Sequence, residues 1–252
     1  MDKPKILFID VETFPIIGYA WRTWDTNLVD IKDNTHLLSF SAKWYGGKQI
    51  TRGLCDYPLY KKNKTSDMEL VKEIWELLDN TDIVVAQNGD AFDIKKINTR
   101  FSFYNLKPPT PFKTIDTVKV ARRHFAFDSN KLNDLCKFLG IGKKINTGGF
   151  ELWLGCISGD NKSWTLMKKY NATDVILLEK LYIRLLPWIK NHPNYGIFTD
   201  KILCPNCGEN RLQARGYAIT KNRRYHRFQC LNCGSWGRDT NNVSLVKPIV
   251  SI

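Results

Sequence analysis

Carboxylates that end or line apolar segments far apart in the chain constrain its fold more than any other feature. Asp10 and Glu12 close the first apolar segment, and Asp93 follows another one. Asp174 lies on the inward-facing stripe of a long predicted helix. A buried carboxylate is costly unless it is paired or ligated, and clustered carboxylates repel one another. The chain should therefore adopt a fold that gathers these groups around a cation.

The apolar pattern predicts an α/β domain with a mixed sheet flanked by helices over residues 1–190. Strands are expected over residues 5–10, 36–45, 49–54, 82–88 and 114–121, with a hairpin turn at Gly46-Gly47. Helices are expected from a capping box formed by Ser66 and Glu69, after Asp93, and over residues 129–139 and 164–186. Residues 191–203 are interpreted as a linker, 204–238 as a small separate module and 239–252 as a C-terminal tail.

The charge of the chain favours a polyanionic partner. The formal net charge is +13, and residues 200–252 hold nine Lys or Arg against three Asp or Glu. Nucleic acid is the usual partner of such a basic protein, although a positive charge can also serve solubility alone. The chain has no apolar run long enough to span a membrane and no secretory leader, and it has an odd number of cysteines. We therefore expect a cytoplasmic protein of a reducing compartment.

Each acidic motif has an ordinary structural alternative. Asp10 and Glu12 are two residues apart on a strand and share one face, but this pattern is common by chance. Asp93 in the first turn of a helix would also complement the helix dipole. Tyr170 and Asp174 are four residues apart on a helix and share its inward face, where an Arg or a helix N-terminus could equally satisfy the carboxylate.

Taken together, the motifs resemble those of a known family. Phe8-Ile9-Asp10-Val11-Glu12-Thr13 is similar to the first motif of the DEDD superfamily of 3′–5′ exonucleases, which have an RNase H-like (DnaQ-like) fold. Residues 88–93 match the second motif, N-x-x-x-F-D, through Asn88, Phe92 and Asp93, and residues 170–174 match the third, Y-x-x-x-D. Tyr170 in place of His indicates the DEDDy branch, which includes the proofreading domain of family B DNA polymerases. The resemblance covers roughly residues 5–186.

The resemblance implies a two-metal hydrolysis of phosphodiester bonds at a single-stranded 3′ end, DNA favoured, with release of nucleoside 5′-monophosphates. By resemblance Asp10, Glu12, Asp93 and Asp174 hold two Mg²⁺ or Mn²⁺ ions, and Tyr170 orients the attacking water. Carboxylate oxygens suit these ions. Thr13, Phe14, Asn88 and Phe92 would lie near the substrate. The alternatives are an RNA exonuclease, a structure-specific endonuclease on the same fold, or a nucleic-acid-binding adaptor with an inactive nuclease fold. The sequence does not identify a replication or repair partner such as a polymerase.

Two matching cysteine pairs predict a zinc ribbon near the C-terminus. Cys204 and Cys207 form the first Cys-x-x-Cys-Gly knuckle, and Cys230 and Cys233 form the second. Four thiolates are the ligand set of a structural zinc site, with paired disulfides or a redox motif as the alternatives. Strands are expected at 216–219 and 225–229.

Basic and aromatic residues alternate between and just after the knuckles. Arg223 and Arg224 are the central cations, and Tyr217, Tyr225, Phe228 and Trp236 are the aromatic residues among them. This pattern is typical of nucleic-acid binding. The alternatives are aromatic residues that only fill a small core, and a ribbon that contacts protein.

Overall fold

The computed structural model describes residues 3–24, 27–244 and 249 and divides the chain into two compact units. Lys5–Tyr182 form the larger unit, and Met1–Pro4 with Ile183–Ile252 form the smaller one. The described residues do not include 1–2, 245–248 and 250–252. Most of the second half of the predicted C-terminal tail therefore lies outside the described residues. No helix in the described ranges is both long and apolar enough to cross a membrane.

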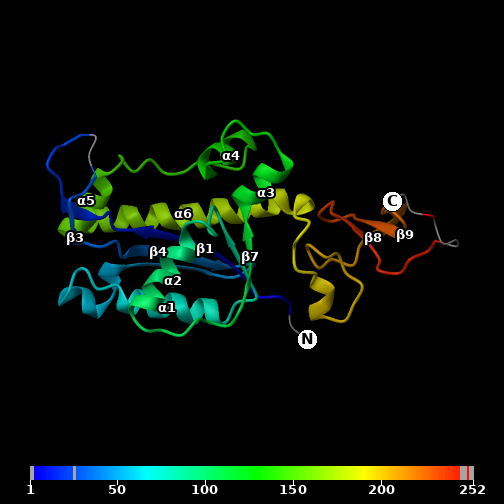
Figure 1. The fold of residues 1–252 in the computed structure, drawn as a ribbon, viewed down its shortest axis with the longest axis horizontal. Helices are drawn as coiled ribbons and strands as arrows, with labels where there is room; N and C mark the ends of the chain where they lie inside the picture. Colours follow the sequence, from blue (N-terminus) through cyan, green and yellow to red (C-terminus); the bar gives the residue numbers. More distant parts are fainter. Residues whose placement is uncertain (1–2, 25–26, 245–248, 250–252) are drawn as a thin grey trace. The chain divides into compact units, whose positions relative to one another are not determined.

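The larger unit is built on a five-stranded mixed sheet with the strand order β5-β4-β1-β6-β7 (Figure 1). β1 pairs antiparallel with β4 and parallel with β6, β4 pairs antiparallel with β5, and β6 pairs parallel with β7. The strands are β1 (Ile6–Thr13), β4 (Leu37–Trp44), β5 (Gln49–Gly53), β6 (Ile83–Ala86) and β7 (Lys113–Asp116). This architecture confirms the predicted α/β class.

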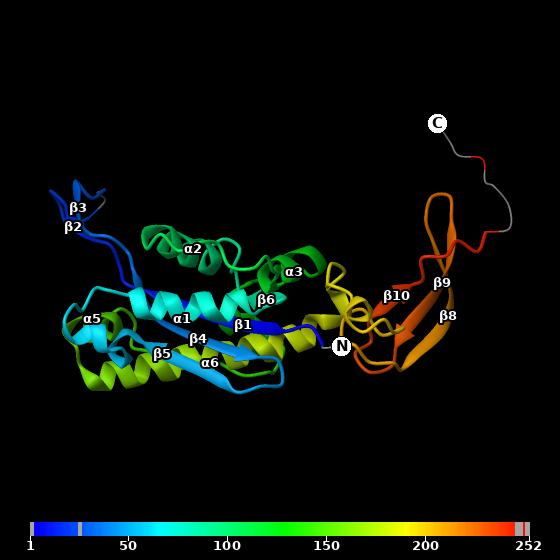
Figure 2. The same ribbon diagram turned by 90° about the horizontal axis from the view of Figure 1, so that it is seen from below.

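Helices cover both faces of the sheet. α1 and α2 lie on one side of it and α6 on the other (Figures 1 and 2). The helices are α1 (Met68–Asp79), α2 (Asp93–Phe103), α3 (Thr117–His124), α4 (Leu132–Phe138), α5 (Glu151–Ser158) and α6 (Asn161–Leu185). Short 3₁₀ helices span Leu54–Asp56, Pro58–Lys61, Leu186–Trp188 and Tyr195–Phe198. Buried side chains of β1, β4, α1, α2 and α6 form one continuous core between these layers.

β1 sets the position of the first two carboxylates. Its first four residues are buried on both faces, and Val11 is buried opposite Phe40 of β4. Alternation along the strand turns Asp10 and Glu12 to the other face, as predicted. The ladder with β4 shifts register between Glu12 and Thr13, where the strand ends.

Two local predictions were wrong at the residue level. α1 begins at Met68 with Asp67 as its N-cap, and the expected capping box from Ser66 to Glu69 does not form. The Asp67 carboxylate is instead buried and accepts hydrogen bonds from the Arg100 guanidinium at 2.6 and 2.8 Å, and the Glu69 carboxylate accepts from the Leu59 N–H. Tertiary partners thus replaced the local capping bonds.

The strand predicted over residues 114–121 is also only partly present. β7 ends at Asp116, whose carboxylate accepts a hydrogen bond from the Val118 N–H at 2.9 Å and so caps α3. The β-branched residues that favoured a strand here lie in the first turns of that helix.

A two-stranded sheet and a helix were not predicted. β2 (Ile17–Tyr19) pairs antiparallel with β3 (Asp30–Asp33), and together with the flanking described residues 16–24 and 27–33 they form what we call the arm. The arm projects from one end of the larger unit (Figure 2). α5 precedes α6, and the tight turn between them runs through Gly159 in the left-handed conformation.

The smaller unit contains a three-stranded antiparallel sheet with the order β10-β9-β8. The strands are β8 (Leu212–Ile219), β9 (Arg224–Cys230) and β10 (Trp236–Arg238), and they contain both predicted ribbon strands. The Asn206 side-chain amide donates to the carbonyls of Leu186 and Ile189 at 2.7 and 2.9 Å, which fixes the first knuckle to the segment after α6.

Candidate functional site

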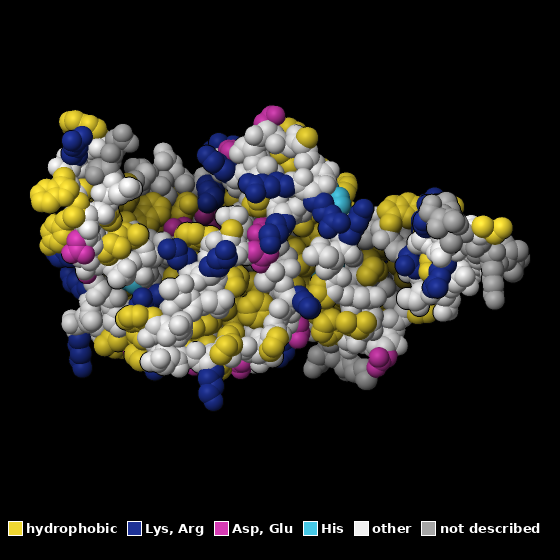
Figure 3. Space-filling model, viewed as in Figure 1, with side chains coloured by type: hydrophobic (Ala, Val, Ile, Leu, Met, Phe, Trp, Pro, Cys, Tyr) yellow, Lys and Arg dark blue, Asp and Glu magenta, His cyan; other side chains and the backbone are white. Residues whose placement is uncertain are grey.

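Three of the predicted carboxylates converge. Asp10 and Glu12 from the end of β1 and Asp174 from the middle of α6 each offer a carboxylate oxygen within 4.8 Å of the others. Asp174 is only 1% exposed. Acidic side chains lie at the bottom of a hollow beside the region of α3 and α4 (Figure 3). Carboxylates from remote parts of the chain therefore lie close together in the fold.

Asp93 lies beside this group rather than in it. It is the first residue of α2 and is buried, and its Oδ1 accepts a hydrogen bond from the Val11 N–H at 3.0 Å. This bond joins the start of α2 to β1 between the two carboxylates of that strand. After burial, the charge of Asp93 is the strongest influence that raises the pKa of Asp10, so the two groups are close.

Burial and mutual repulsion disfavour the charged forms of these acids. Burial, followed by the charges of Asp93, Glu12 and Asp174, raises the pKa of Asp10 well above its usual range. Burial and the charge of Asp174 raise the pKa of Glu12 to about 8. Burial raises the pKa of Asp93 to about 6. A bound cation would reverse this penalty, which is the electrostatic signature of a metal site.

Neutral and cationic donors compensate part of the charge. The Asn171 side-chain amide donates to Asp10 Oδ2 at 2.5 Å, and Asn171 is itself held by the Ser39 hydroxyl at 3.2 Å. Lys144 Nζ donates to Asp174 Oδ2 at 2.6 Å and to the Tyr170 hydroxyl at 3.0 Å. Burial lowers the pKa of Lys144, but the attraction of Asp174 outweighs that and raises it. Neither Asn171 nor Lys144 was expected from the sequence.

One oxygen of the cluster supports a metal site directly. Asp174 Oδ1 is buried and has no hydrogen-bond partner among the described residues. A buried acceptor without a partner costs free energy, and a divalent cation would satisfy it. The hard oxygen donors and the orphaned atom together fit Mg²⁺ or Mn²⁺.

Tyr170 lies one helical turn before Asp174, and its ring packs against Trp153 of α5 with the centroids 6.3 Å apart. Burial and the charge of Asp174 raise the pKa of its phenol to about 12. The hydroxyl therefore keeps its proton at neutral pH and can donate a hydrogen bond.

The residues expected near the substrate differ in their surroundings. Asn88 is exposed and has a φ of 60°, and its N–H donates to the carboxylate of Asp116 at 3.0 Å. Phe92 is partly exposed, with Lys96 Nζ 5.8 Å from its ring centroid. Phe14 is buried and stacks on His36 at 4.0 Å, so it supports the site from inside the core.

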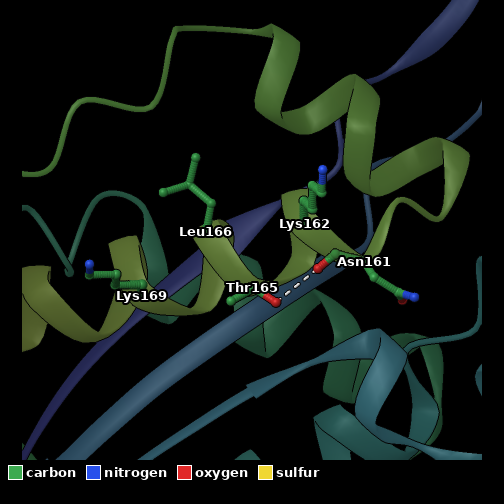
Figure 4. Close-up of a pocket in the computed structure, with 5 residues that line it drawn as sticks. All are labelled: Asn161, Lys162, Thr165, Leu166 and Lys169. Atoms are coloured by element: carbon green, nitrogen blue, oxygen red, sulfur yellow. Dashed lines mark hydrogen bonds between the residues drawn. The ribbon is translucent and has the colours of Figure 1, made fainter.

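A hollow of about 370 Å³ lies on the N-terminal part of α6 (Figure 4). The residues that line it are Asn161, Lys162, Thr165, Leu166 and Lys169. The Thr165 hydroxyl donates a hydrogen bond to the Asn161 carbonyl. Lys169 directly precedes Tyr170. Lys162 and Lys169 give this surface a positive charge.

The four predicted zinc ligands form a second cluster. The Sγ atoms of Cys204 and Cys233 are 3.6 Å apart, those of Cys207 and Cys230 are 3.7 Å apart, and all four lie within 4.8 Å of one another. Four sulfurs bound to zinc at about 2.3 Å would have edges of about 3.8 Å in a tetrahedron. These distances exclude disulfides, and each cysteine is free. The geometry fits one tetrahedral Zn²⁺.

Glycines complete both knuckles. Gly208 and Gly234 have φ of 75° and 80°, and their N–H groups donate to the carbonyls of Cys204 and Cys230 at 3.0 Å. This left-handed conformation favours glycine, which explains its place after the second cysteine of each pair.

Guanidinium groups lie over aromatic rings on the ribbon. Arg224 lies 4.5 Å from the ring centroid of Tyr217, and Arg227 lies 5.0 Å from that of Trp236. Arg223 is exposed at the turn between β8 and β9. These contacts hold cations and aromatic faces together on an open surface.

The comparisons with known proteins support the fold. The family model of the RNase_H superfamily matches residues 32–186. This match begins after Asp10 and Glu12. Among solved structures, the chain is similar to a family B DNA polymerase from the hyperthermophilic archaeon Pyrobaculum calidifontis, with a TM-score of 0.56 and 15% identity. The match covers 74% of this chain and 25% of the polymerase, so the chain spans about a quarter of that protein's length. No curated protein matches the sequence.

Proposed function

The chain belongs to the RNase H superfamily, and from this premise we propose that it is a metal-dependent 3′–5′ exonuclease that acts on single-stranded nucleic acid, DNA favoured. The observation that carries the proposal is the convergence of Asp10, Glu12 and Asp174 within 4.8 Å, with Asp93 beside them. A structural role for these acids would call for a neutralising partner at each one. Raised pKa values at Asp10 and Glu12 speak for a missing cation instead.

Asp10, Glu12 and Asp174 would hold the divalent ions, and Asp93 would contribute from the start of α2. When bound, two such ions activate water and stabilise the leaving 3′-oxygen in an in-line displacement. Tyr170 keeps its phenolic proton at neutral pH, and its hydroxyl would orient the attacking water.

Lys144 would supply positive charge to the site in addition to the divalent ions. Its ammonium group has three protons, of which two are used by Asp174 and Tyr170. The third can bind a phosphate oxygen of the strand. Because Lys144 stays charged at neutral pH, it adds electrostatic stabilisation where negative charge develops.

The ribbon would serve as a second grip on the same strand. The four cysteines would hold one structural Zn²⁺, and that binding would supply much of the folding free energy of this small module. Arg223 and Arg224 would contact phosphates, and the neighbouring aromatic faces would stack on bases.

The decisive experiment uses end-labelled DNA and RNA strands of matched sequence with Mg²⁺ or Mn²⁺. We expect stepwise shortening from the 3′ end with release of nucleoside 5′-monophosphates, loss of cleavage in Asp10→Ala, and retained binding without cleavage in Asp174→Asn. Equal inactivity of the wild type and Asp10→Ala would identify an adaptor. Cleavage of a circular single strand would identify an endonuclease, and preference for the RNA strand would reassign the substrate.

A further inference from the structure

The arm exposes an unusual amount of aromatic surface. Trp21 is 87% exposed and Trp24 is 75% exposed, and Tyr19 at the end of β2 is also exposed. Other large apolar side chains of the arm are also exposed, namely Ile16, Ile17, Leu28, Val29 and Ile31. Contiguous apolar surface of this kind marks a binding site more often than a free surface.

A cavity of about 340 Å³ lies where the root of the arm meets α2. Ile16 and His36 line it from the arm side, and Lys96, Thr99 and Phe103 line it from α2. Its floor is rigid, because His36 stacks on Phe14 and the neighbouring Arg100 is held by the buried Asp67 carboxylate. The volume lies at the lower end of the range for small-molecule sites, which suits one planar base.

The segments that form both walls of the cavity begin close in sequence to the carboxylates. The arm follows Glu12 by four residues, and α2 begins at Asp93. At about 1.5 Å per helical residue, Lys96 lies about 4.5 Å and Phe103 about 15 Å along the axis from Asp93. Stacked nucleotides rise about 3.4 Å each, so these two residues lie about one to four nucleotides from Asp93 along the helix axis.

The charges favour nucleic acid as the occupant. Lys96 lines the cavity as a cation and no carboxylate among the described residues lines it, while the charge of Arg100 is compensated by Asp67. Lys96 Nζ contacts the ring of Phe92 rather than an acidic group, so it remains free for a phosphate. An apolar and aromatic wall with a cation at its edge is the arrangement that binds a single strand by stacking and charge.

We propose that this cavity and the exposed aromatic side chains of the arm form a binding site for the bases of the single strand that lie upstream of the cleaved bond. The proposal rests on the proposed function for the identity of the strand. Phe103 and Ile16 contact a base, Lys96 contacts its phosphate, and Trp21 supports the bases beyond. The hollow on α6, with Lys162 and Lys169, is the competing path.

The first test measures binding and cleavage separately. In the full-length Asp10→Ala protein, Lys96→Gln and Phe103→Ala should each raise the Kd for a 12-nucleotide single strand about tenfold by fluorescence anisotropy. The matched controls Lys95→Gln and Phe138→Ala, which alter an exposed Lys and an exposed Phe away from the cavity, should change it less than twofold. In the otherwise wild-type protein, the Lys96 and Phe103 variants should raise KM for the 12-mer, whereas Lys95→Gln and Phe138→Ala should leave that KM unchanged.

The second test needs no substitution in the cavity or in the arm. A strand with 4-thiothymidine three nucleotides from its 3′ end, bound to Asp10→Ala and irradiated, should crosslink to peptides within residues 16–36 or 96–103. Crosslinks confined to 161–169, or equal effects of the cavity and control variants on Kd, would overturn the proposal. Because both readouts detect binding, they decide it even if the wild type cleaves nothing, which would refute only the exonuclease.

Discussion

Replacement of Glu12 by Gln should stabilise the protein in the absence of Mg²⁺ and Mn²⁺, and the gain should depend on pH. The pKa of Glu12 is raised from 4.5 to about 8 by burial and by Asp174. A carboxyl with a raised folded-state pKa costs nothing below pH 4.5 and increasingly destabilises the fold as the pH rises through about 8. The linkage relation gives roughly 4 kcal/mol at pH 7.5 and roughly 1 kcal/mol at pH 5. Neighbouring carboxyls can take up the proton instead, so the pH 7.5 gain should be about 2 to 4 kcal/mol.

The assay is urea unfolding followed by tryptophan fluorescence at pH 5.0 and pH 7.5, with the zinc site left intact. Glu76→Gln on the exposed side of α1 is the matched control and should change the free energy of unfolding by less than about 0.5 kcal/mol at either pH. Addition of Mn²⁺ at pH 7.5 should stabilise the wild type more than Glu12→Gln. A gain that is equal at both pH values, or that the control shares, would refute the electrostatic reasoning.

Three further changes test other parts of the molecule. Lys144→Gln should reduce kcat at least tenfold and lower the free energy of unfolding by about 2 kcal/mol without Mn²⁺, because the buried Asp174 loses its partner. Mn²⁺ should restore the stability of this variant but not its kcat. An unchanged kcat would contradict this role. Arg223→Ala with Arg224→Ala should weaken binding of single strands and reduce the slope of log K against log salt by about 1 to 2, whereas an unchanged slope would count against the ribbon as a grip. Cys207→Ser should abolish stoichiometric zinc and expose the ribbon to proteolysis while the larger unit stays folded; full zinc content, measured with a colorimetric chelator, would argue against the four-cysteine site.

The sequence predicted the backbone of the site because its signals are local. An apolar strand that ends in two carboxylates separated by one residue fixes which face they occupy, and β1 has that form, with Val11 buried between them. The spacing of Tyr170 and Asp174 likewise fixes one face of a helix, and Asp174 is indeed buried there. Periodicity therefore gave the strand, the helix and the side-chain directions.

Residues that act across long separations carried no such signal. Lys144 lies in an irregular loop 30 residues before Asp174, and Asn171 reaches Asp10 across 161 residues. Nothing in the local pattern distinguishes Lys144 from its neighbour Lys143. The failed capping box has the same origin, because Asp67 is bound by Arg100 from α2. The arm was missed because its aromatic residues follow neither the strand nor the helix period.

The distribution of partners within the site shows which charge is left for a metal. Asp10 has the Asn171 amide, Asp93 has the Val11 N–H, and one oxygen of Asp174 has Lys144. The second oxygen of Asp174 is buried and has no hydrogen-bond partner among the described residues. This oxygen belongs to the cluster in which Glu12 and Asp174 offer carboxylate oxygens within 4.8 Å of each other. A purely structural acid would be expected to be satisfied by the fold, so the unpartnered oxygen of Asp174 supports the proposed metal site.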